Sequence, residues 1–339
     1  MDKSVAVIGG GVAGIETAAT LSNLGYKVML FEKEKELGGN VLGWDRLFPT
    51  RRPAHEVVSN SLATLNSTCE IHTSTTVNSI DENNGIFNIG VISGQHFEAN
   101  AVVLSTGFEL FPAEKKEEYG YGIFENVITS RDLEQMFRKH GKPTMVNGNT
   151  PKRVAFIHCV GSRDEKVNRP YCSKVCCVTA VKQALEVKEA LPDTEVFNFY
   201  MDLRMFGHGY EQLYKEAQMH GVTFVRGRLS ETNEATGGGL VIKVEDTLAG
   251  KPMRLTVDLV VLMVGMNPRP ETDTILNSLG LPKNEDGFAA VKDVHLDFTK
   301  TKTKGVFIAG ACTGPNNITD SINAARAAAI QVHSYLNPQ

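Results

Sequence analysis

The sequence predicts an α/β protein made of two three-layer units, each built on a parallel sheet. The first observation is an apolar strand at 5–8, a glycine-rich turn, an alanine- and leucine-patterned helix to about 24, and a second strand at 27–31. Such a β-α-β order builds a parallel sheet. The second observation is that the order strand, loop, helix, strand returns at 153–200. The third is the length of 339 residues, which suits about two domains at roughly 150 residues each.

The other elements follow from local patterns. Helical apolar spacing predicts helices, continuous apolar runs predict buried strands, and glycine, asparagine and proline mark turns. We expect helices at about 54–65, 131–139, 173–190, 210–220 and 319–335; strands at 101–105, 153–158, 195–200, 259–264 and 305–309; short antiparallel segments over 71–98; and a hairpin around Gly237-Gly238-Gly239. Thr129 or Ser130 is the expected N-cap of the 131–139 helix.

Composition and charge exclude several classes of protein. Apolar residues make up 42% and charged residues 22% of the chain, which is typical of globular proteins. The net charge is −4, so the basic surface of a nucleic-acid-binding protein is not expected. The longest apolar run, 259–266, is too short to span a membrane. Because a core strand begins near Val5, a signal peptide has no room, and we expect a cytoplasmic protein with reduced cysteines.

The turn after the first strand carries a dinucleotide-binding pattern. It reads Gly9-Gly10-Gly11-Val12-Ala13-Gly14, a G-x-G-x-x-G. The first Gly permits a tight bend, the second lets backbone approach a pyrophosphate, and the third allows close helix–strand packing. Glu32 follows at the end of the second strand, where a carboxylate binds ribose hydroxyls. This order predicts a Rossmann-like dinucleotide site rather than a simple tight turn.

Three later segments bear on which dinucleotide binds. Gly38-Gly39 follows Glu32 closely, Ser105-Thr106-Gly107 ends a predicted strand, and residues 303–310 precede the last helix. Together they resemble the two-dinucleotide-binding-domain flavoproteins, the glutathione and thioredoxin reductase superfamily, in which such segments flank FAD. The resemblance implies bound FAD, a homodimer, and one Rossmann-like domain inserted in another.

The resemblance also implies domain boundaries and FAD contacts. The FAD-binding domain would comprise 1–112 and 267–339, a degenerate NAD-like domain 151–266, and a connecting segment 113–150. The residues expected at FAD are Gly9, Gly11, Val12, Ala13, Gly14, Glu32, Lys33, Gly38, Gly39, Asn40, Val77, Thr106, Gly107, Gly310, Ala311 and Ile318. Ala311 departs from the superfamily, which has at this position an Asp that hydrogen-bonds the flavin side chain.

Two features of disulfide reductases are missing. No cysteine lies at 40–44, after the first Gly pair, and the chain has no C-x-x-C. The turn of the second unit, 158–164, contains only one Gly, so it lacks the close-approach backbone that a nicotinamide dinucleotide needs. We therefore expect neither disulfide exchange nor efficient reduction by NAD(P)H.

Four of the six cysteines lie together in sequence, in the pattern C-x12-C-x3-C-C: Cys159, Cys172, Cys176 and Cys177. Cys159 would end a parallel strand, where sites of α/β sheets gather. Cys172 and Cys176 would share one face at a helix start, and the helix N–H groups would stabilise thiolates. Four thiolates suit an iron–sulfur cluster or tetrahedral zinc, and buried packing is the third reading. Cys69 and Cys312 are expected to be lone thiols.

Residues 159–164 and 171–177 resemble the signature of the A-type subunits of heterodisulfide reductase, as do 201–210 and 314–318. In that family the four cysteines ligate a [4Fe–4S] cluster beside FAD. The chain lacks a C-x2-C-x2-C run, and in this respect it resembles the short form of these subunits that is found in the heterodisulfide reductase-like complexes of sulfur oxidisers. This implies an electron-transfer subunit with B- and C-type partner subunits and a lipoate-binding protein as sulfur carrier. His158 and Arg204 would tune the cofactors or simply pack.

Three alternatives remain open at this stage. One is an FAD-dependent NAD(P)H oxidoreductase, against which the single Gly of the second turn argues. Another is the related subunit of a quinone-interacting oxidoreductase, with the same cofactors but a different partner. The last is a zinc-stabilised FAD-binding assembly module.

Overall fold

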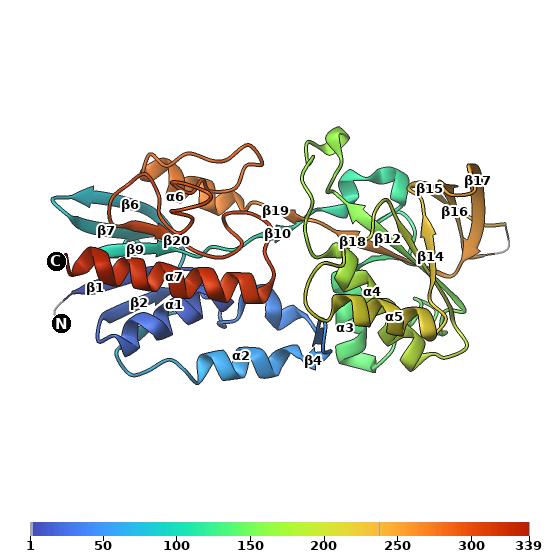
Figure 1. The fold of residues 1–339 in the computed structure, drawn as a ribbon, viewed down its shortest axis with the longest axis horizontal. Coiled ribbons are helices and arrows are strands. Elements are labelled where there is room, and N and C mark those ends of the chain that lie inside the picture. The colour runs from blue at the N-terminus through green and yellow to red at the C-terminus, as the bar shows by residue number, and fades with distance from the viewer. Residues whose placement is uncertain (1–2, 237, 339) are drawn as a thin grey trace. The chain divides into compact units, whose positions relative to one another are not determined.

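The computed structural model describes residues 3–236 and 238–338, and the chain divides into two compact units. The first unit comprises 3–42, His55–Glu109 and 267–338. The second comprises Gly43–Ala54 and Leu110–Met266. The second unit is thus inserted in the sequence of the first, and it also takes in Gly43–Ala54, which we call the strap. Figure 1 shows both units as ribbons.

The first unit has three layers. Its parallel sheet has the order β20-β9-β1-β2-β5, formed by β1 (Ser4–Ile8), β2 (Lys27–Phe31), β5 (Cys69–His72), β9 (Ala101–Leu104) and β20 (Val306–Ile308). Helices α1 (Val12–Asn23) and α7 (Ile318–Leu336) pack on one face, and the antiparallel strands β6 (Val77–Asn83), β7 (Ile86–Val91) and β8 (His96–Ala99) lie on the other. Side chains alternate between the faces of a strand, so Val5 and Val7 meet the helices whereas Ala6 and Ile8 meet the antiparallel strands.

The second unit repeats this plan. Its parallel sheet has the order β11-β18-β12-β13-β14, formed by β11 (Val127–Thr129), β12 (Arg153–Val160), β13 (Glu195–Tyr200), β14 (Thr223–Arg226) and β18 (Leu259–Val264). Helices α3 (Ser130–His140), α4 (Cys176–Ala190) and α5 (Tyr210–Met219) pack on one face, and β15 (Leu229–Glu234), β16 (Leu240–Asp246) and β17 (Lys251–Val257) form the antiparallel layer. Val154 and Phe156 face the helices, whereas Ala155 and Ile157 face the antiparallel layer.

Short elements complete the described chain. They are η1 (Gly39–Gly43), α2 (Ala54–Leu62), η2 (Ala113–Lys115), η3 (Glu117–Tyr119), η4 (Glu165–Val167), α6 (Pro270–Ser278), and the paired strands β3 (Arg46–Leu47) with β4 (Arg52–Pro53) and β10 (Glu109–Leu110) with β19 (Met266–Asn267). No helix among the described residues is both long enough and apolar enough to cross a membrane.

The predicted α/β class with two Rossmann-like three-layer units is confirmed, and most elements lie where the sequence placed them. Thr129, not Ser130, caps α3: its hydroxyl accepts from Asp132 N at 3.3 Å, and Asp132 accepts from Thr129 N at 2.8 Å. Helix α6, which begins with a proline, was not predicted. Of the predicted glycine hairpin, Gly237 lies outside the described residues, while β15 and β16 pair antiparallel on either side of it.

The prediction that a helix starts at residue 173 is wrong, because α4 begins at Cys176. The Ser173 side chain is buried and its hydroxyl accepts a hydrogen bond from Met266 N at 2.9 Å. Lys174 has a left-handed φ of 65°, a conformation that a helix cannot contain. Cys172 therefore lies in a loop and does not share a helical face with Cys176.

Candidate cofactor sites

The turn between β1 and α1 requires its glycines. Gly9 has φ of 105°, and a Cβ there would lie 2.4 Å from Ser105 O. A Cβ on Gly14 would lie 1.8 Å from Gly9 O, so only Gly lets helix and strand approach this closely. Gly11 differs, because a Cβ on it would meet nothing within 4 Å. The open side of the turn is therefore at Gly11, the position at which a pyrophosphate would approach.

The N-terminus of α1 lies at this opening. Gly11 is the N-cap, in an extended conformation, and no side chain caps the helix. The first intrahelical bond runs from Ile15 N to Gly11 O at 2.9 Å. The N–H groups of Val12, Ala13 and Gly14 thus belong to the first helical turn, where they and the helix dipole favour an anion.

Glu32 is held against the same turn from the end of β2. Its side chain is buried, Oε2 accepts a hydrogen bond from Gly10 N at 2.7 Å, and Oε1 accepts one from Glu34 N at 2.9 Å. Each carboxylate oxygen can accept more than one bond, so ribose hydroxyls would still find acceptors. Its neighbour Lys33 instead pairs with Glu271, at 2.5 Å, on the surface of this unit.

The other predicted FAD segments meet α1 at its start. Gly38 N donates to Gly10 O at 2.8 Å, and a Cβ on Gly39 would lie 3.1 Å from Gly11 Cα. Ser105 Oγ donates to Ile8 O and Gly9 O, both at 3.0 Å. A Cβ on Gly310 would lie 2.7 Å from Ala13 Cβ. Three segments distant in sequence are therefore brought to the turn at the start of α1, as a dinucleotide site requires.

The remaining predicted FAD residues are more dispersed. Asn40 Nδ2 donates to Phe108 O at 3.0 Å, and Thr106 Oγ1 lies 2.7 Å from Thr272 Oγ1. Gly107 has φ of 71° and open space at the Cβ position. The Val77 side chain is buried in the core between the parallel sheet and the antiparallel strands of the first unit.

The segment before α7 is built differently from the start of α1. Ile318 is the first residue of α7, and Asn317 caps the helix by accepting from Asp320 N at 2.8 Å. Ala311 is buried beside Gly310. Cys312 is also buried, its thiol donates to Ala309 O at 3.3 Å, and burial raises its pKa to about 11. Cys312 is therefore a packed thiol of the first unit.

The backbone of Cys159, near the end of β12, has a strained conformation of the kind that is found at functional sites. The pairing of β12 with β18 shifts register between Ile157 and Val160, so the strand carries a bulge that re-aims its side chains. Cys159 has φ of 58°, which costs a non-glycine residue about 1–2 kcal/mol. Such strain is retained where the surrounding structure demands it, frequently at functional sites.

The bulge brings Cys159 to the start of α4. Cys159 Sγ lies 3.8 Å from Cys176 Sγ, and all six cysteines of the chain are free thiols. Cys177 follows in the first turn of α4, where its thiol donates to Asp202 O at 3.5 Å. Cys159, Cys176 and Cys177 are buried, and no side chain caps α4. The helix N–H groups and dipole therefore act on the thiols.

Cys172 is fixed in the loop before α4 by its neighbours. Arg163 N donates to Tyr171 O at 2.8 Å, and Tyr171 Oη donates to Met266 O at 2.8 Å. Ser173 is anchored to Met266 as described above. The guanidinium of Arg163 interacts electrostatically with both Cys159 and Cys172. The loop thus holds the fourth cysteine on the same side of the unit as the other three.

The electrostatics of this group favour thiolates at two positions. The hydrogen bond from Cys176 lowers the pKa of Cys177 to about 4 despite burial, with help from His158. The same kind of bond from Cys176, together with the charges of His158 and Arg163, lowers the pKa of Cys159. The pKa of Cys176 itself is raised well above its usual value by its bonds to Cys159 and Cys177.

This donor set suits a thiolate-ligated group in its chemistry, since thiolates are the ligands of iron–sulfur clusters and of structural zinc. In residues 3–236 and 238–338, however, no three Cys, His, Asp or Glu side chains are gathered so as to hold a single metal ion. Cys69, like Cys312, belongs to the first unit, and burial raises its pKa to about 11.

The one glycine of the second turn is covered. Gly161 has φ of 69°, and a Cβ on it would lie 2.0 Å from the Phe111 ring. Phe111 is buried and belongs to the same unit. Its ring therefore lies where open backbone would be needed for a pyrophosphate, in contrast to the open space at Gly11.

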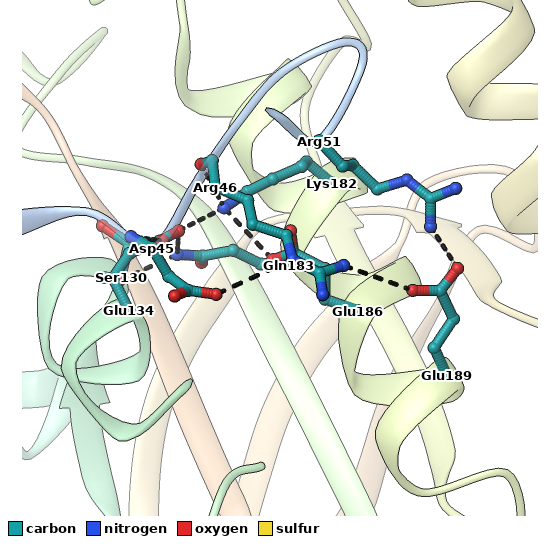
Figure 2. A network of polar contacts seen from close by, with 9 residues as sticks. All are labelled: Asp45, Arg46, Arg51, Ser130, Glu134, Lys182, Gln183, Glu186 and Glu189. Atoms are coloured by element: carbon teal, nitrogen blue, oxygen red, sulfur yellow. Dashed lines mark hydrogen bonds and ion pairs between the residues drawn. The ribbon is translucent and has the colours of Figure 1, made fainter. Parts of the chain in front are cut away.

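A buried ionic network fixes α4 against α3 and the strap (Figure 2). Lys182 is buried, ion-pairs with Glu134 and with Glu186 (3.1 Å), and donates to Arg46 O at 3.0 Å. Glu134 Oε2 accepts from Asp45 N at 2.8 Å. Because Lys182 and the cysteines at 176 and 177 share α4, this network sets the position of the helix that carries two of the four clustered cysteines.

The strap is also anchored at its outer end. Arg51 ion-pairs with Glu189 on α4 and, at 2.9 Å, with Glu216 on α5. Gln183 Nε2 donates to Ser130 O at 2.8 Å and to Glu134 Oε1 at 2.6 Å, which ties α3 into the same network. Sequence reasoning did not find this network, because its only signal was a set of charges on helix faces.

The model of one protein family, described as pyridine nucleotide-disulphide oxidoreductase, matches residues 3–157 and 195–329. The chain belongs to this family. The expectation of a flavin-dependent oxidoreductase is thereby confirmed. The matched residues leave out 158–194, which holds His158 and the four clustered cysteines. The pyridine nucleotide-disulphide oxidoreductase pattern is therefore interrupted at the strand end and helix start described above.

Relatives over nearly the whole chain confirm the resemblance to the A-type subunits of heterodisulfide reductase. The A-type subunit of the H2:CoB-CoM heterodisulfide,ferredoxin reductase of Methanothermobacter marburgensis is 31% identical over 97% of this chain and 63% of its own length. The A-type iron-sulfur subunit of the CoB–CoM heterodisulfide reductase of Methanocaldococcus jannaschii is 32% identical over 98% of this chain and 64% of its own. The chain thus spans less than two thirds of these relatives.

Solved structures with a similar fold include thioredoxin reductases. That of T. acidophilum has a TM-score of 0.68 at 19% identity, covering 98% of this chain and 99% of its own. That of Lactococcus lactis has a TM-score of 0.68 at 16% identity, covering 99% of both chains. At this identity the likeness concerns the fold alone.

Proposed function

We propose that the chain is an FAD- and [4Fe–4S]-containing electron-transfer subunit of a heterodisulfide reductase-like complex. The observation that carries the proposal is the segment 158–194. It interrupts the family match, and it brings Cys159, Cys176 and Cys177 to one helix terminus. The relatives that align across it are named as A-type subunits of heterodisulfide reductases.

Residues of the first unit would hold FAD. The uncapped start of α1 would receive the pyrophosphate at Gly11, where a Cβ would meet nothing. Glu32, held by Gly10 N and Glu34 N, would accept the ribose hydroxyls. Gly38-Gly39 and Gly310, both packed on α1, would line the path of the dinucleotide. Lys33, whose side chain pairs with Glu271, and Val77, whose side chain is buried, remain among the proposed FAD contacts.

Residues of the second unit would hold the cluster. Cys159, Cys172, Cys176 and Cys177 would supply the thiolates, which the start of α4 and Arg163 stabilise electrostatically. When bound, a flavin exchanges electron pairs and an iron–sulfur cluster exchanges single electrons. The two cofactors together therefore connect two-electron transfer with one-electron transfer.

The partners we propose follow from the names of the relatives and from the sequence resemblance. They are B- and C-type subunits of a heterodisulfide reductase-like complex, and, in a sulfur-oxidising version, a lipoate-binding protein as sulfur carrier. A cytoplasmic homodimer completes the proposal. Copurification from the native host under anaerobic conditions tests the partners directly.

The cofactors are tested on the isolated chain. Protein purified anaerobically is assayed for flavin, iron and acid-labile sulfide. The proposal expects about one FAD and about four irons with four sulfides per chain. Zinc in place of iron would favour the assembly-module alternative, and protein isolated without flavin would overturn the proposal.

A further inference from the structure

His158, beside the clustered cysteines, is a buried histidine, and only one of its ring nitrogens has a hydrogen bond of regular geometry. Its Nε2 lies 2.9 Å from Oδ1 of Asn198, which is itself fully buried on the neighbouring strand β13. Among the described residues, His158 Nδ1 and Asn198 Nδ2 are buried without a hydrogen bond of regular geometry. A buried polar atom left unpaired costs about 1–3 kcal/mol, so two adjacent ones call for an explanation.

Asn198 occupies Nε2 of His158, so Nδ1 is the ring nitrogen left for the interaction between the side chains of His158 and Cys177. Cys177 is also hydrogen-bonded to Cys176 and to the backbone of Arg204, and its thiol donates to Asp202 O at 3.5 Å. The contact with Asp202 O is suited to a protonated sulfur only, because a thiolate cannot donate.

We propose that His158 is a positioning residue that donates a hydrogen bond from Nδ1 to the sulfur of cluster-bound Cys177, with Asn198 selecting the ring tautomer. This rests on the proposed [4Fe–4S] cluster. In the neutral ring the proton moves from Nε2 to Nδ1, and the Asn198 amide turns so that Nδ2 donates to Nε2. The 2.9 Å contact is kept, and both unpaired nitrogens gain a partner.

The consequence is a more easily reduced cluster. Hydrogen bonds to ligand sulfurs raise the reduction potential, because they stabilise the extra negative charge of the reduced state. The neutral ring of His158 supplies such a hydrogen bond without adding a net charge to the site. The nearby cation Arg163 interacts with Cys159 and Cys172, whereas the hydrogen bond proposed for His158 goes to Cys177.

The test compares His158→Leu with His158→Asn, whose side-chain nitrogen occupies nearly the place of Nδ1. Each full-length variant and the wild type is loaded anaerobically, and iron and sulfide are counted. The potential is measured by redox titration followed by electron paramagnetic resonance. Electron–nuclear double resonance on the reduced cluster then tests for a hyperfine coupling to an exchangeable proton.

We expect equal iron in all three proteins. In His158→Leu the ratio of reduced to oxidised cluster at a fixed potential should fall roughly tenfold, about 59 mV for one electron, and the exchangeable coupling should vanish. His158→Asn should restore both. An unchanged potential and coupling in His158→Leu would overturn the inference while leaving the proposed function intact.

A second variant keeps the test decisive where His158→Leu does not load. Asn198→Leu removes the group that selects the tautomer but touches no cysteine. It should shift the potential in the same direction by a smaller amount, and an unshifted potential would overturn the inference. A wild type that holds no cluster would instead contradict the proposed function itself.

Discussion

The thiol sulfurs of Cys159 and Cys176 lie 3.8 Å apart, although one residue ends a strand and the other begins a helix. A left-handed backbone at Cys159 and a register shift in β12 produce this approach. In an ordinary parallel strand the chain would continue without such strain. The strained backbone at Cys159 therefore accompanies the close approach of two of the clustered cysteines.

Six single Cys→Ser variants, made anaerobically, test the ligand set. Replacing Cys159, Cys172, Cys176 or Cys177 should abolish or strongly alter the iron content and the paramagnetic signal of the reduced protein. Cys69→Ser and Cys312→Ser serve as controls and should leave both unchanged, since these thiols lie in the first unit. If Cys312→Ser lost the iron and the paramagnetic signal while Cys177→Ser kept them, the assignment would be contradicted. The fourth ligand would then lie in the turn after Gly310.

Glu32→Ala should weaken FAD binding. The substitution removes the buried carboxylate that bonds Gly10 N and Glu34 N. Loss of charge-assisted hydrogen bonds of about 1.5–3 kcal/mol corresponds to roughly tenfold or more in affinity. Flavin occupancy after dialysis measures the effect. Glu36→Ala, at an exposed position nearby, is the matched control, and equal occupancy in both variants would refute the role of Glu32.

Neither NADH nor NADPH should reduce the flavin efficiently. The second turn has a single glycine, and the Phe111 ring covers it. Stopped-flow absorbance with stoichiometric NADH should show little bleaching within the time in which dithionite bleaches the flavin fully. Rapid bleaching by NADH would favour an NAD(P)H oxidoreductase instead.

Lys182→Met should destabilise the protein strongly. It leaves the carboxylates of Glu134 and Glu186 buried without their cation, and breaking such a buried pair costs about 3–5 kcal/mol. Denaturant unfolding measures the loss. Lys215→Met removes an exposed lysine paired with Glu211 on α5 and should cost no more than about 1 kcal/mol. Similar losses in both variants would show that the network contributes little.

Glu186→Gln should change how stability depends on pH. Burial, aided by the charge of Glu134 and opposed by Lys182, raises the pKa of Glu186 to about 7 from a usual value of 4.5. A raised carboxyl pKa means that the folded state binds the extra proton, so its contribution to stability is full below pH 4.5 and is lost as the pH rises through 7. The variant should therefore gain stability relative to wild type at pH 8 but not at pH 4. A constant difference between these pH values would contradict the assignment.

Local patterns in the sequence predicted much of this architecture. The β-α-β order and the spacing of Gly9, Gly11, Gly14 and Glu32 were sufficient to place a dinucleotide turn, because each feature lies within one supersecondary unit. The grouping of four cysteines was equally visible. These are short-range signals, and the structure brings the predicted segments together around the start of α1.

What could not be predicted depends on long-range contacts. Helix α4 starts at Cys176 because Ser173 is bonded to Met266, a residue 93 positions away. The approach of Phe111 to Gly161 and of Asn198 to His158 likewise joins residues that are far apart in the sequence. Nothing in the local composition of these segments records such partners, so the position of Cys172 in a loop was missed.

The buried network under the strap bears on how the protein can be dissected. A recombinant fragment covering Leu110–Met266 would contain the whole second sheet and all four clustered cysteines, yet it would lack Gly43–Ala54. Glu134 would lose its backbone donor at Asp45, and Lys182 would lose its acceptor at Arg46. An interior salt bridge would then face solvent along one side of α4. Autonomous folding of the cysteine-bearing half therefore requires that the twelve residues of the strap, Gly43–Ala54, be supplied with it, as a fused or added peptide.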